Sequence, residues 1–177
     1  MTVQIPLSDR ALAQDRDGGG GTHEIAPDLA YLRTVLVNVV FIGRPGQPGW
    51  VLVDTGIIGS AGAIRDAANA RFGSDNPPAA IIQTHGHFDH VGGLESLSRE
   101  WDVLVYAHPL EAPYLTGKAS YPTPDTKADG GVMPKLAPMF PRTPVDISER
   151  LRLLSEDGSL PHLPGWRWGH VPGHTPG

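Results

Sequence analysis

The sequence predicts an α/β domain, because short runs of β-branched and aromatic residues alternate with stretches of helical periodicity. Ile64, Ala68 and Phe72 fall on one helical face, and strand-like apolar runs precede and follow that stretch. Glycine and proline supply 22 and 18 residues, so many loops are expected between short elements. In such a fold we expect the functional side chains on loops at the ends of the strands.

The bulk properties limit the classes of protein to which the chain can belong. Its 177 residues suggest one domain, and its net charge of −5 argues against nucleic acid as the main partner. It has no cysteine, which excludes a disulfide, a thiolate metal site and a cysteine nucleophile. The start lacks the pattern of a signal peptide and no apolar run could span a bilayer, so we expect a cytoplasmic protein without a membrane partner.

The first part of the chain is expected to form an arm and a β-hairpin. Residues 1–21 end in four glycines and predict a flexible N-terminal arm, ahead of a domain over 22–177. Residues 31–42 are rich in β-branched and aromatic side chains and predict one long strand. A turn rich in glycine and proline follows over 43–49, and residues 50–53 predict the second strand of the hairpin.

The middle of the chain is expected to alternate helices and strands. The helix predicted over 60–72 has Ser60 at the position of an N-cap and Gly73 at its end. A buried strand is predicted over 79–84. The following elements are a helix from Leu94 to about Trp101, a strand over 103–106 and a short helix from Pro109 to about Leu115.

Residues 113–144 interrupt this pattern. They hold seven prolines together with tyrosine, methionine and phenylalanine side chains, and such a long stretch without periodicity is usually functional or disordered. The apolar side chains favour a cap or insert over the site, and a solvated linker is the alternative. A strand is expected again over 151–154, and Trp166, Trp168 and His170 alternate on one side of the chain as they would in a strand.

The densest group of chemically active side chains directly follows the strand predicted over 79–84. His85, His87, Asp89 and His90 fall within six residues. In an extended chain the side chains at i and i+2 project to one side, so the first three can converge, whereas His90 needs a tight turn to join them. Imidazoles and carboxylates are zinc ligands, and crowding so many titratable groups without a cation would be costly. The cluster therefore predicts a metal site.

These residues resemble the H-x-H-x-D-H signature of the metallo-β-lactamase superfamily. Three further motifs agree with the resemblance: Asp54-Thr55-Gly56, Gly92-Gly93 and Pro172-Gly173-His174-Thr175-Pro176-Gly177. The resemblance spans roughly 31–177 and implies the N-terminal portion of an αββα sandwich with a metal site at one edge of its sheets. The family continues past the last motif with a bridging aspartate and a final histidine. A C-terminally incomplete domain is therefore expected, with one sheet face exposed.

The same resemblance implies a division of the ligands between two metal ions. His85, His87 and His174 match the three imidazole ligands of the first ion, and Asp89 and His90 match two ligands of the second. One or two zinc ions are expected, with iron as the alternative, because imidazole and carboxylate suit both metals. Three neutral imidazoles leave an open position for water, as a catalytic zinc requires.

Two carboxylates have expected roles beside the first ion. Asp89 is the expected catalytic residue, which orients the nucleophile and helps relay its proton. Asp54 matches a family position that supports the site by fixing the ring nitrogen of a ligand, and an aspartate that only starts the turn before Thr55-Gly56 is the alternative. His170 is expected to be a strand-face residue rather than a ligand.

The expected function is zinc-dependent hydrolysis, in which a metal-bound hydroxide attacks an ester, thioester, lactone or lactam-type bond of a small molecule. A mononuclear iron persulfide dioxygenase, which would use similar ligands, is the alternative from another enzyme class. A third hypothesis is a non-catalytic, truncated fragment that folds only with a complementing partner (an oligomer or a C-terminal segment), or that does not fold stably at all. The metal present and the cooperativity of unfolding distinguish these hypotheses.

Overall fold

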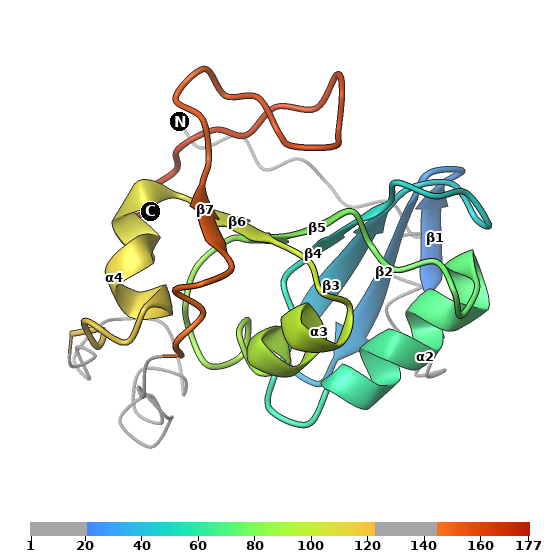
Figure 1. Ribbon diagram of the computed structural model, residues 1–177, viewed down its shortest axis with the longest axis horizontal. Helices are drawn as coiled ribbons and strands as arrows, with labels where there is room; N and C mark the ends of the chain where they lie inside the picture. The colour runs from blue at the N-terminus through green and yellow to red at the C-terminus, as the bar shows by residue number, and fades with distance from the viewer. Residues whose placement is uncertain (1–20, 123–144) are drawn as a thin grey trace, which may run out of the picture.

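The structure is a computed structural model that describes residues 21–122 and 145–177. Within these residues one seven-stranded sheet forms, and its strands lie side by side in chain order (Figure 1). Three antiparallel pairings join β1 (His23–Ala26), β2 (Leu29–Thr34), β3 (Val37–Ile42) and β4 (Val51–Val53). Three parallel pairings join β4 to β5 (Ala80–Gln83), β6 (Val105–Ala107) and β7 (Leu151–Leu153).

One face of the sheet is covered by helices α2 (Ala61–Phe72) and α3 (Leu94–Glu100) (Figure 1). Every second strand residue points to this face, and Phe41, Trp50 and Leu52 are buried there. The Trp50 ring stacks on Phe72 of α2, with centroids 4.2 Å apart and planes within 6°. Burial of each large apolar side chain contributes about 1.5–3 kcal/mol. The larger of the two buried apolar clusters lies in this layer, which therefore contains most of the core.

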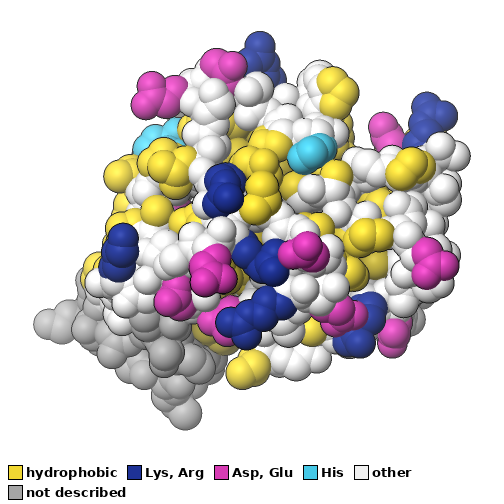
Figure 2. All heavy atoms as spheres, viewed as in Figure 1, with side chains coloured by type: hydrophobic (Ala, Val, Ile, Leu, Met, Phe, Trp, Pro, Cys, Tyr) yellow, Lys and Arg dark blue, Asp and Glu magenta, His cyan; other side chains and the backbone are white. Residues whose placement is uncertain are grey.

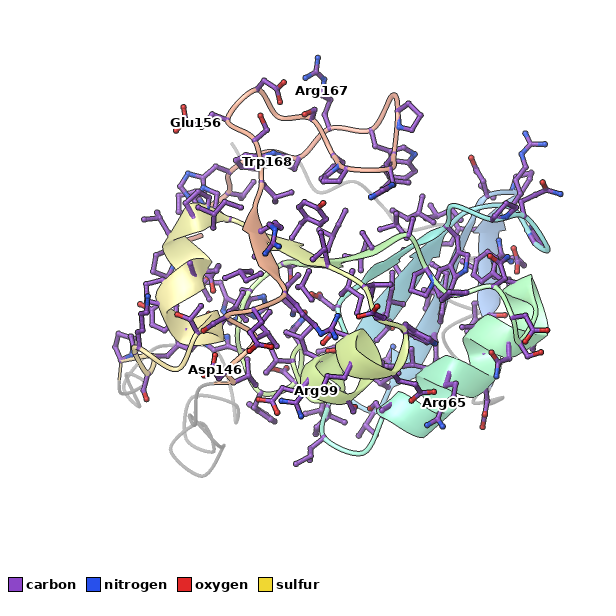
Figure 3. The ribbon with its side chains drawn as sticks, viewed as in Figure 1. Arg65, Arg99, Asp146, Glu156, Arg167 and Trp168 are labelled. Atoms are coloured by element: carbon purple, nitrogen blue, oxygen red, sulfur yellow. The ribbon has the colours of Figure 1, made fainter. Side chains whose placement is uncertain are left out.

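Part of the opposite face is covered by the chain that follows β7. Leu160 and Leu163 pack there against Val51 and Ile82. Figure 3 shows this segment, with Trp168 and Arg167, arching beyond the end of β7. The Trp168 indole donates to the Ser155 carbonyl (3.0 Å), and the Arg167 guanidinium donates to the Asp157 carbonyl (2.7 Å). The expectation of a bare sheet face is therefore wrong for the part of the face beneath Leu160 and Leu163.

The strand that the alternation of Trp166, Trp168 and His170 suggested does not form. Residues 164–171 belong to no strand, and only an isolated bridge joins Ser159 to Arg167. Leu160 and Leu163, which precede this segment, pack against the sheet face, whereas residues 164–171 are mostly exposed and do not pair along an edge of the sheet. An alternating pattern without a neighbouring strand to supply hydrogen bonds does not make a strand.

The single long strand predicted over 31–42 is wrong, because the chain reverses at Val35 to form the β2–β3 hairpin. Val35 has φ of 61°, a conformation that β-branched residues rarely adopt. The turn is closed by Leu36 N–H, which donates to the Thr34 carbonyl (2.7 Å), and by the Thr34 hydroxyl, which donates to the Val37 carbonyl (3.1 Å). No glycine, proline or asparagine marks it.

The other predicted elements lie close to their expected positions. Helix α2 ends at Gly73 as predicted, but Ser60 makes no side-chain capping bond. Trp101 lies just beyond α3, and the short helix divides into η1 (Pro109–Glu111) and α4 (Ala112–Leu115). Residues 1–20 and 123–144 lie outside the described part, so the flexible arm and most of the 113–144 cap stay predictions.

Charged side chains are intermixed on the face that Figure 2 shows, with basic and acidic groups close together rather than segregated. Ion pairs of the described residues include Arg65 with Glu100 (3.1 Å) and Arg150 with Asp102 (2.8 Å). In residues 21–122 and 145–177, the helices are all too short or too polar to cross a membrane. The predicted lack of a nucleic-acid partner and the predicted cytoplasmic location stay predictions.

Two glycine-containing loops meet at the ends of β4 and β5 and position the site. Gly92 N–H donates to the Gly56 carbonyl (2.7 Å), and Thr55 N–H donates to the His90 carbonyl (2.8 Å). A Cβ on Gly92 would lie 2.1 Å from the backbone of Ile57. Only glycine permits this approach, so the Gly92-Gly93 motif fixes the spacing between the Asp54 loop and the histidine loop.

The Gly92→Ala change should therefore lower the free energy of unfolding by about 1–3 kcal/mol, because backbone atoms must move to admit the methyl group. Urea unfolding followed by circular dichroism measures this loss. Gly62→Ala is the matched control, because Gly62 lies in α2 with open space around it and alanine favours a helix by about 1 kcal/mol. Similar destabilisation by both changes would contradict the steric explanation.

Candidate metal centre

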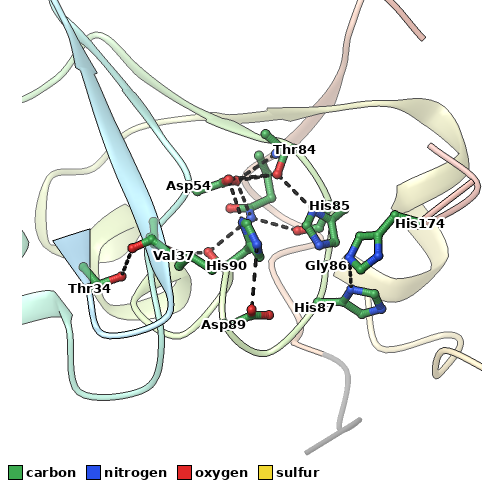
Figure 4. Close-up of polar contacts among 12 residues, drawn as sticks. Thr34, Val37, Asp54, Thr84, His85, Gly86, His87, Asp89, His90 and His174 are labelled. Carbon is green, nitrogen blue, oxygen red and sulfur yellow. Dashed lines mark hydrogen bonds and ion pairs between the residues drawn. The ribbon is translucent and has the colours of Figure 1, made fainter. Parts of the chain in front are cut away.

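Three histidines from two distant segments converge at one point. Ring nitrogens of His85, His87 and His174 all lie within 4.8 Å of one another. The first two come from the loop after β5, and the third comes from residues 172–177 (Figure 4). Their rings meet nearly edge to face, at interplanar angles of 76–86°. His85 and His87 converge as the sequence predicted, whereas Asp89, which was expected to converge with them, is not part of the cluster.

The tautomer of His85 follows from its neighbours. The Thr84 hydroxyl oxygen lies 2.8 Å from Asp54 Oδ2 and 3.0 Å from Asp54 Oδ1. A hydroxyl has a single hydrogen, and here Thr84 donates it to the Asp54 carboxylate. The same hydroxyl lies 3.0 Å from His85 Nδ1, so it accepts from an Nδ1–H group. The lone pair of His85 must then be on Nε2. That atom is buried, has no hydrogen-bond partner among the described residues, and faces the other two histidines.

The Asp54 carboxylate stabilises this arrangement through several hydrogen bonds. Its side chain is 4% exposed, and its oxygens accept from the Gln83 amide (2.9 Å), the Thr84 N–H (2.9 Å) and the Thr84 hydroxyl. Its backbone φ is 61°, in a region where aspartate is enriched. Asp54 therefore contacts the side chains of Gln83 and Thr84, and also that of His90, whatever it also contributes to the turn.

His90 is oriented by the same carboxylate. Its Nδ1 lies 2.8 Å from Asp54 Oδ2, which assigns the hydrogen to Nδ1 and the lone pair to Nε2. His90 Nε2 lies 3.9 Å from Asp89 Oδ2. Burial opposes the charged imidazolium, but the hydrogen bond and charge of Asp54, together with Asp89, outweigh it and raise the pKa of His90. Asp89 and His90 adjoin the three-histidine cluster without being part of it, and their predicted role at a second ion stays a prediction.

The three-histidine cluster has the donor chemistry of a divalent metal site. His87 Nδ1 and His174 Nε2 lie 3.0 Å apart. Two nitrogens bound at 2.0–2.1 Å to one tetrahedral zinc ion would be about 3.3 Å apart, so a small adjustment of these rings would admit the ion. Burial and the neighbouring histidines His90, His87 and His174 lower the pKa of His85 to about 3. Burial also lowers the pKa of His87. Neutral imidazoles are the form that binds a metal.

The remaining histidines lie elsewhere. His23 stacks on Tyr31, with ring centroids 4.9 Å apart. His108 stacks on His170 (4.3 Å), and the exposed His162 is not part of the metal-ligand cluster. Four contact residues of the site were not singled out from the sequence: Gln83, Thr84, Glu111 and Tyr121. Among these four, Gln83 is polar at the end of a buried strand and Tyr121 lies in the segment predicted to cap the site, so these two carried a signal in the sequence, whereas Thr84 and Glu111 did not.

The Thr84 hydroxyl gives a direct test of the tautomer assignment. Thr84→Val removes the hydroxyl at nearly constant volume, and the metal affinity should fall about 10–100-fold, as is typical when the partner of a histidine ligand is lost. Competition with a chromophoric chelator measures this affinity. Thr84→Ser keeps the hydroxyl and should bind within about threefold of the wild type. Equal affinities for the valine and serine variants would refute the assignment.

The low pKa of His85 predicts how pH affects the metal-free protein. In the unfolded chain the pKa of His85 is the ordinary 6.5, whereas in the folded chain burial and the neighbouring histidines lower that pKa to about 3. The unfolded state therefore binds more protons in this window, and the contribution of His85 to stability falls as pH falls from about 6.5 towards 3. Chemical unfolding at several pH values should show a smaller pH dependence for His85→Gln than for wild type. An unchanged dependence would contradict the prediction.

Comparison with known proteins identifies the architecture. The metallo-beta-lactamase superfamily profile matches residues 32–177. The probable metallo-hydrolase YflN of Bacillus subtilis (strain 168) is 46% identical over 167 residues, which cover 94% of this chain and 62% of YflN. The probable metallo-hydrolase YybB of the same organism is 34% identical over 126 residues, covering 71% of this chain and 48% of YybB.

Solved structures agree with this result. The Rm3 metallo-beta-lactamase superposes with a TM-score of 0.66 at 26% identity, over 97% of this chain and 58% of that protein. BJP-1, a subclass B3 metallo-beta-lactamase of Bradyrhizobium japonicum, superposes with a TM-score of 0.60 at 26% identity, over 88% and 53%. The chain thus spans about half to three fifths of these relatives. The profile, the relatives and the fold together confirm the predicted resemblance, and the chain belongs to the metallo-β-lactamase superfamily.

Proposed function

We propose that the chain is the metal-binding portion of a zinc-dependent hydrolase that cleaves an ester, thioester, lactone or lactam-type bond of a small molecule. The observation that supports this most strongly is the convergence of His85, His87 and His174 with no fourth side chain in the cluster among the described residues. Three protein ligands are typical of catalytic zinc, whereas structural zinc usually has four. The relatives named as metallo-hydrolases and metallo-β-lactamases support the reaction class.

A zinc ion held by these three histidines would polarise the carbonyl oxygen of the substrate and lower the pKa of a water molecule. The residues of the chain prepare the site for this chemistry. Thr84 and Asp54 keep the His85 lone pair on Nε2, directed at the cluster. His174 is solvent-exposed, which leaves that side of the cluster open to a substrate.

Asp89 is the proposed proton acceptor. Its side chain is 23% exposed and lies beside His90 at the edge of the histidine cluster. A carboxylate in this position can orient an attacking water molecule and accept its proton, and it can later return that proton to the leaving group. Asp54 is less suited to this role, because its buried oxygens are already occupied by donors from Gln83, Thr84 and His90.

Loss of one ligand should abolish both metal retention and hydrolysis. His87→Ala is expected to hold less than a tenth of the zinc of the wild type, and any hydrolysis should fall at least 100-fold. Elemental analysis after purification under metal-retaining conditions measures the zinc, and a panel of ester, thioester, lactone and β-lactam substrates measures the activity. Removal of zinc from the wild type with a chelator should abolish the same activity, and added zinc should restore it.

His162→Asn is the control for this change, because His162 is exposed and has φ of 62°, which asparagine tolerates. It should leave metal content and activity unchanged. Equal effects from the two substitutions would refute the ligand assignment. Iron in place of zinc, with oxygen consumption on a persulfide substrate, would favour the dioxygenase alternative. A chain that holds no metal and lacks cooperative unfolding would favour the non-catalytic fragment.

A further inference from the structure

We propose that Glu111 is a positioning residue for the metal centre, which holds the two histidine-bearing loops together through their backbone N–H groups. This inference rests on the proposed function, because it assigns Glu111 a role towards the ion that the three histidines are arranged to bind. Glu111 lies in η1, outside every motif of the sequence that predicted the site.

Glu111 is fully buried, with 0% of its surface exposed. No lysine or arginine in residues 21–122 and 145–177 forms an ion pair with it. Burial of a carboxylate without a cation is costly unless hydrogen-bond donors surround it. The local structure of η1 does not require an acid here, so the reason for a carboxylate has to come from the groups that it contacts.

Those groups belong to the two loops that carry the metal ligands. Glu111 Oε2 accepts from Gly86 N–H at 3.1 Å, and Gly86 is the residue between His85 and His87. Glu111 Oε1 accepts from Gly177 N–H at 2.9 Å, three residues after His174. One carboxylate therefore joins two loops whose ligands His87 and His174 are 87 residues apart in sequence.

Tyr121 adds a third donor and extends the contact to a ligand. Its hydroxyl donates to Glu111 Oε2 and accepts from Gly86 N–H at 2.7 Å. Its ring packs on His87 with centroids 4.3 Å apart, and it stacks on Tyr114 at 3.9 Å. By fixing the Tyr121 hydroxyl, Glu111 also sets the ring that lies against His87.

These contacts require both side-chain oxygens of Glu111 to act as hydrogen-bond acceptors. Gly86, Gly177 and Tyr121 all donate, and only an ionised carboxylate offers two acceptor oxygens without a hydrogen of its own. A glutamine would direct its NH₂ group at one of these donors. The approach is also close, since a Cβ on Gly177 would lie 2.5 Å from Glu111 Cγ. The negative charge further suits a site that is to hold a divalent cation with three neutral ligands.

The test measures metal affinity rather than activity. Zinc affinity is determined by chelator competition for the wild-type protein, Glu111→Gln, Glu111→Asp and Tyr121→Phe, and the visible spectrum of the cobalt(II)-loaded forms reports the coordination. Glu111→Gln should weaken zinc binding at least tenfold and change the cobalt spectrum. Glu111→Asp should recover part of that loss, because it keeps the charge, and Tyr121→Phe should lose less, because it keeps the carboxylate.

Glu95→Gln is the matched control, since Glu95 also accepts a backbone N–H, that of Asp146 (3.1 Å), but contacts neither histidine loop. It should bind zinc as the wild type does. A Glu111→Gln variant with a lower melting temperature but wild-type zinc affinity and cobalt spectrum would show a role in folding alone and overturn the inference. If Glu111→Gln does not fold, unchanged affinity and spectrum in Glu111→Asp and Tyr121→Phe would overturn it. Failure of the wild type to bind zinc would instead refute the proposed function.

Discussion

The buried charge of Asp54 is the constraint on which the rest of the site depends. A carboxylate that is 4% exposed needs donors for its oxygens, and here the donors come from Gln83, Thr84 and His90. These residues all follow or end β5, while Asp54 directly follows β4. Parallel pairing of β4 with β5 places both strand ends at the same edge of the sheet. The sheet topology therefore positions the carboxylate, which in turn positions the imidazole rings.

Much of this could be predicted from the sequence, because the signals are local. The helical period of α2, the apolar run of β5 and the spacing of His85, His87, Asp89 and His90 each lie within a short stretch of chain. The hairpin at Val35 could not be predicted in the same way. Its tight turn uses a β-branched residue at positive φ and is stabilised by the pairing of β2 with β3, which no short window contains.

The residues that support the metal ligands could not be predicted from the sequence for a related reason. Thr84 and Glu111 are ordinary in their local context, as a residue after a strand and an acid in the first turn of a helix. Their importance arises from contacts with Asp54 and with Gly86 and Gly177, which only the folded chain brings together. Metal ligands are recognisable by type and spacing, whereas the groups that orient them are recognisable only by what they touch.

The large sequence separation of His87 and His174 has a consequence for how the chain is held together. A sequence separation of 87 residues makes the chain between them a long loop that the bound ion would close, and the chain has no cysteine that could form a disulfide across it. Because the three ligands converge only in the folded chain, an ion at this position would bind the native state, and its binding free energy would add to the free energy of folding. The segment after β7 contributes no strand to the sheet. Because this segment supplies His174, its docked position and metal binding are thermodynamically linked, and chelation would weaken the docking of the residues around His174.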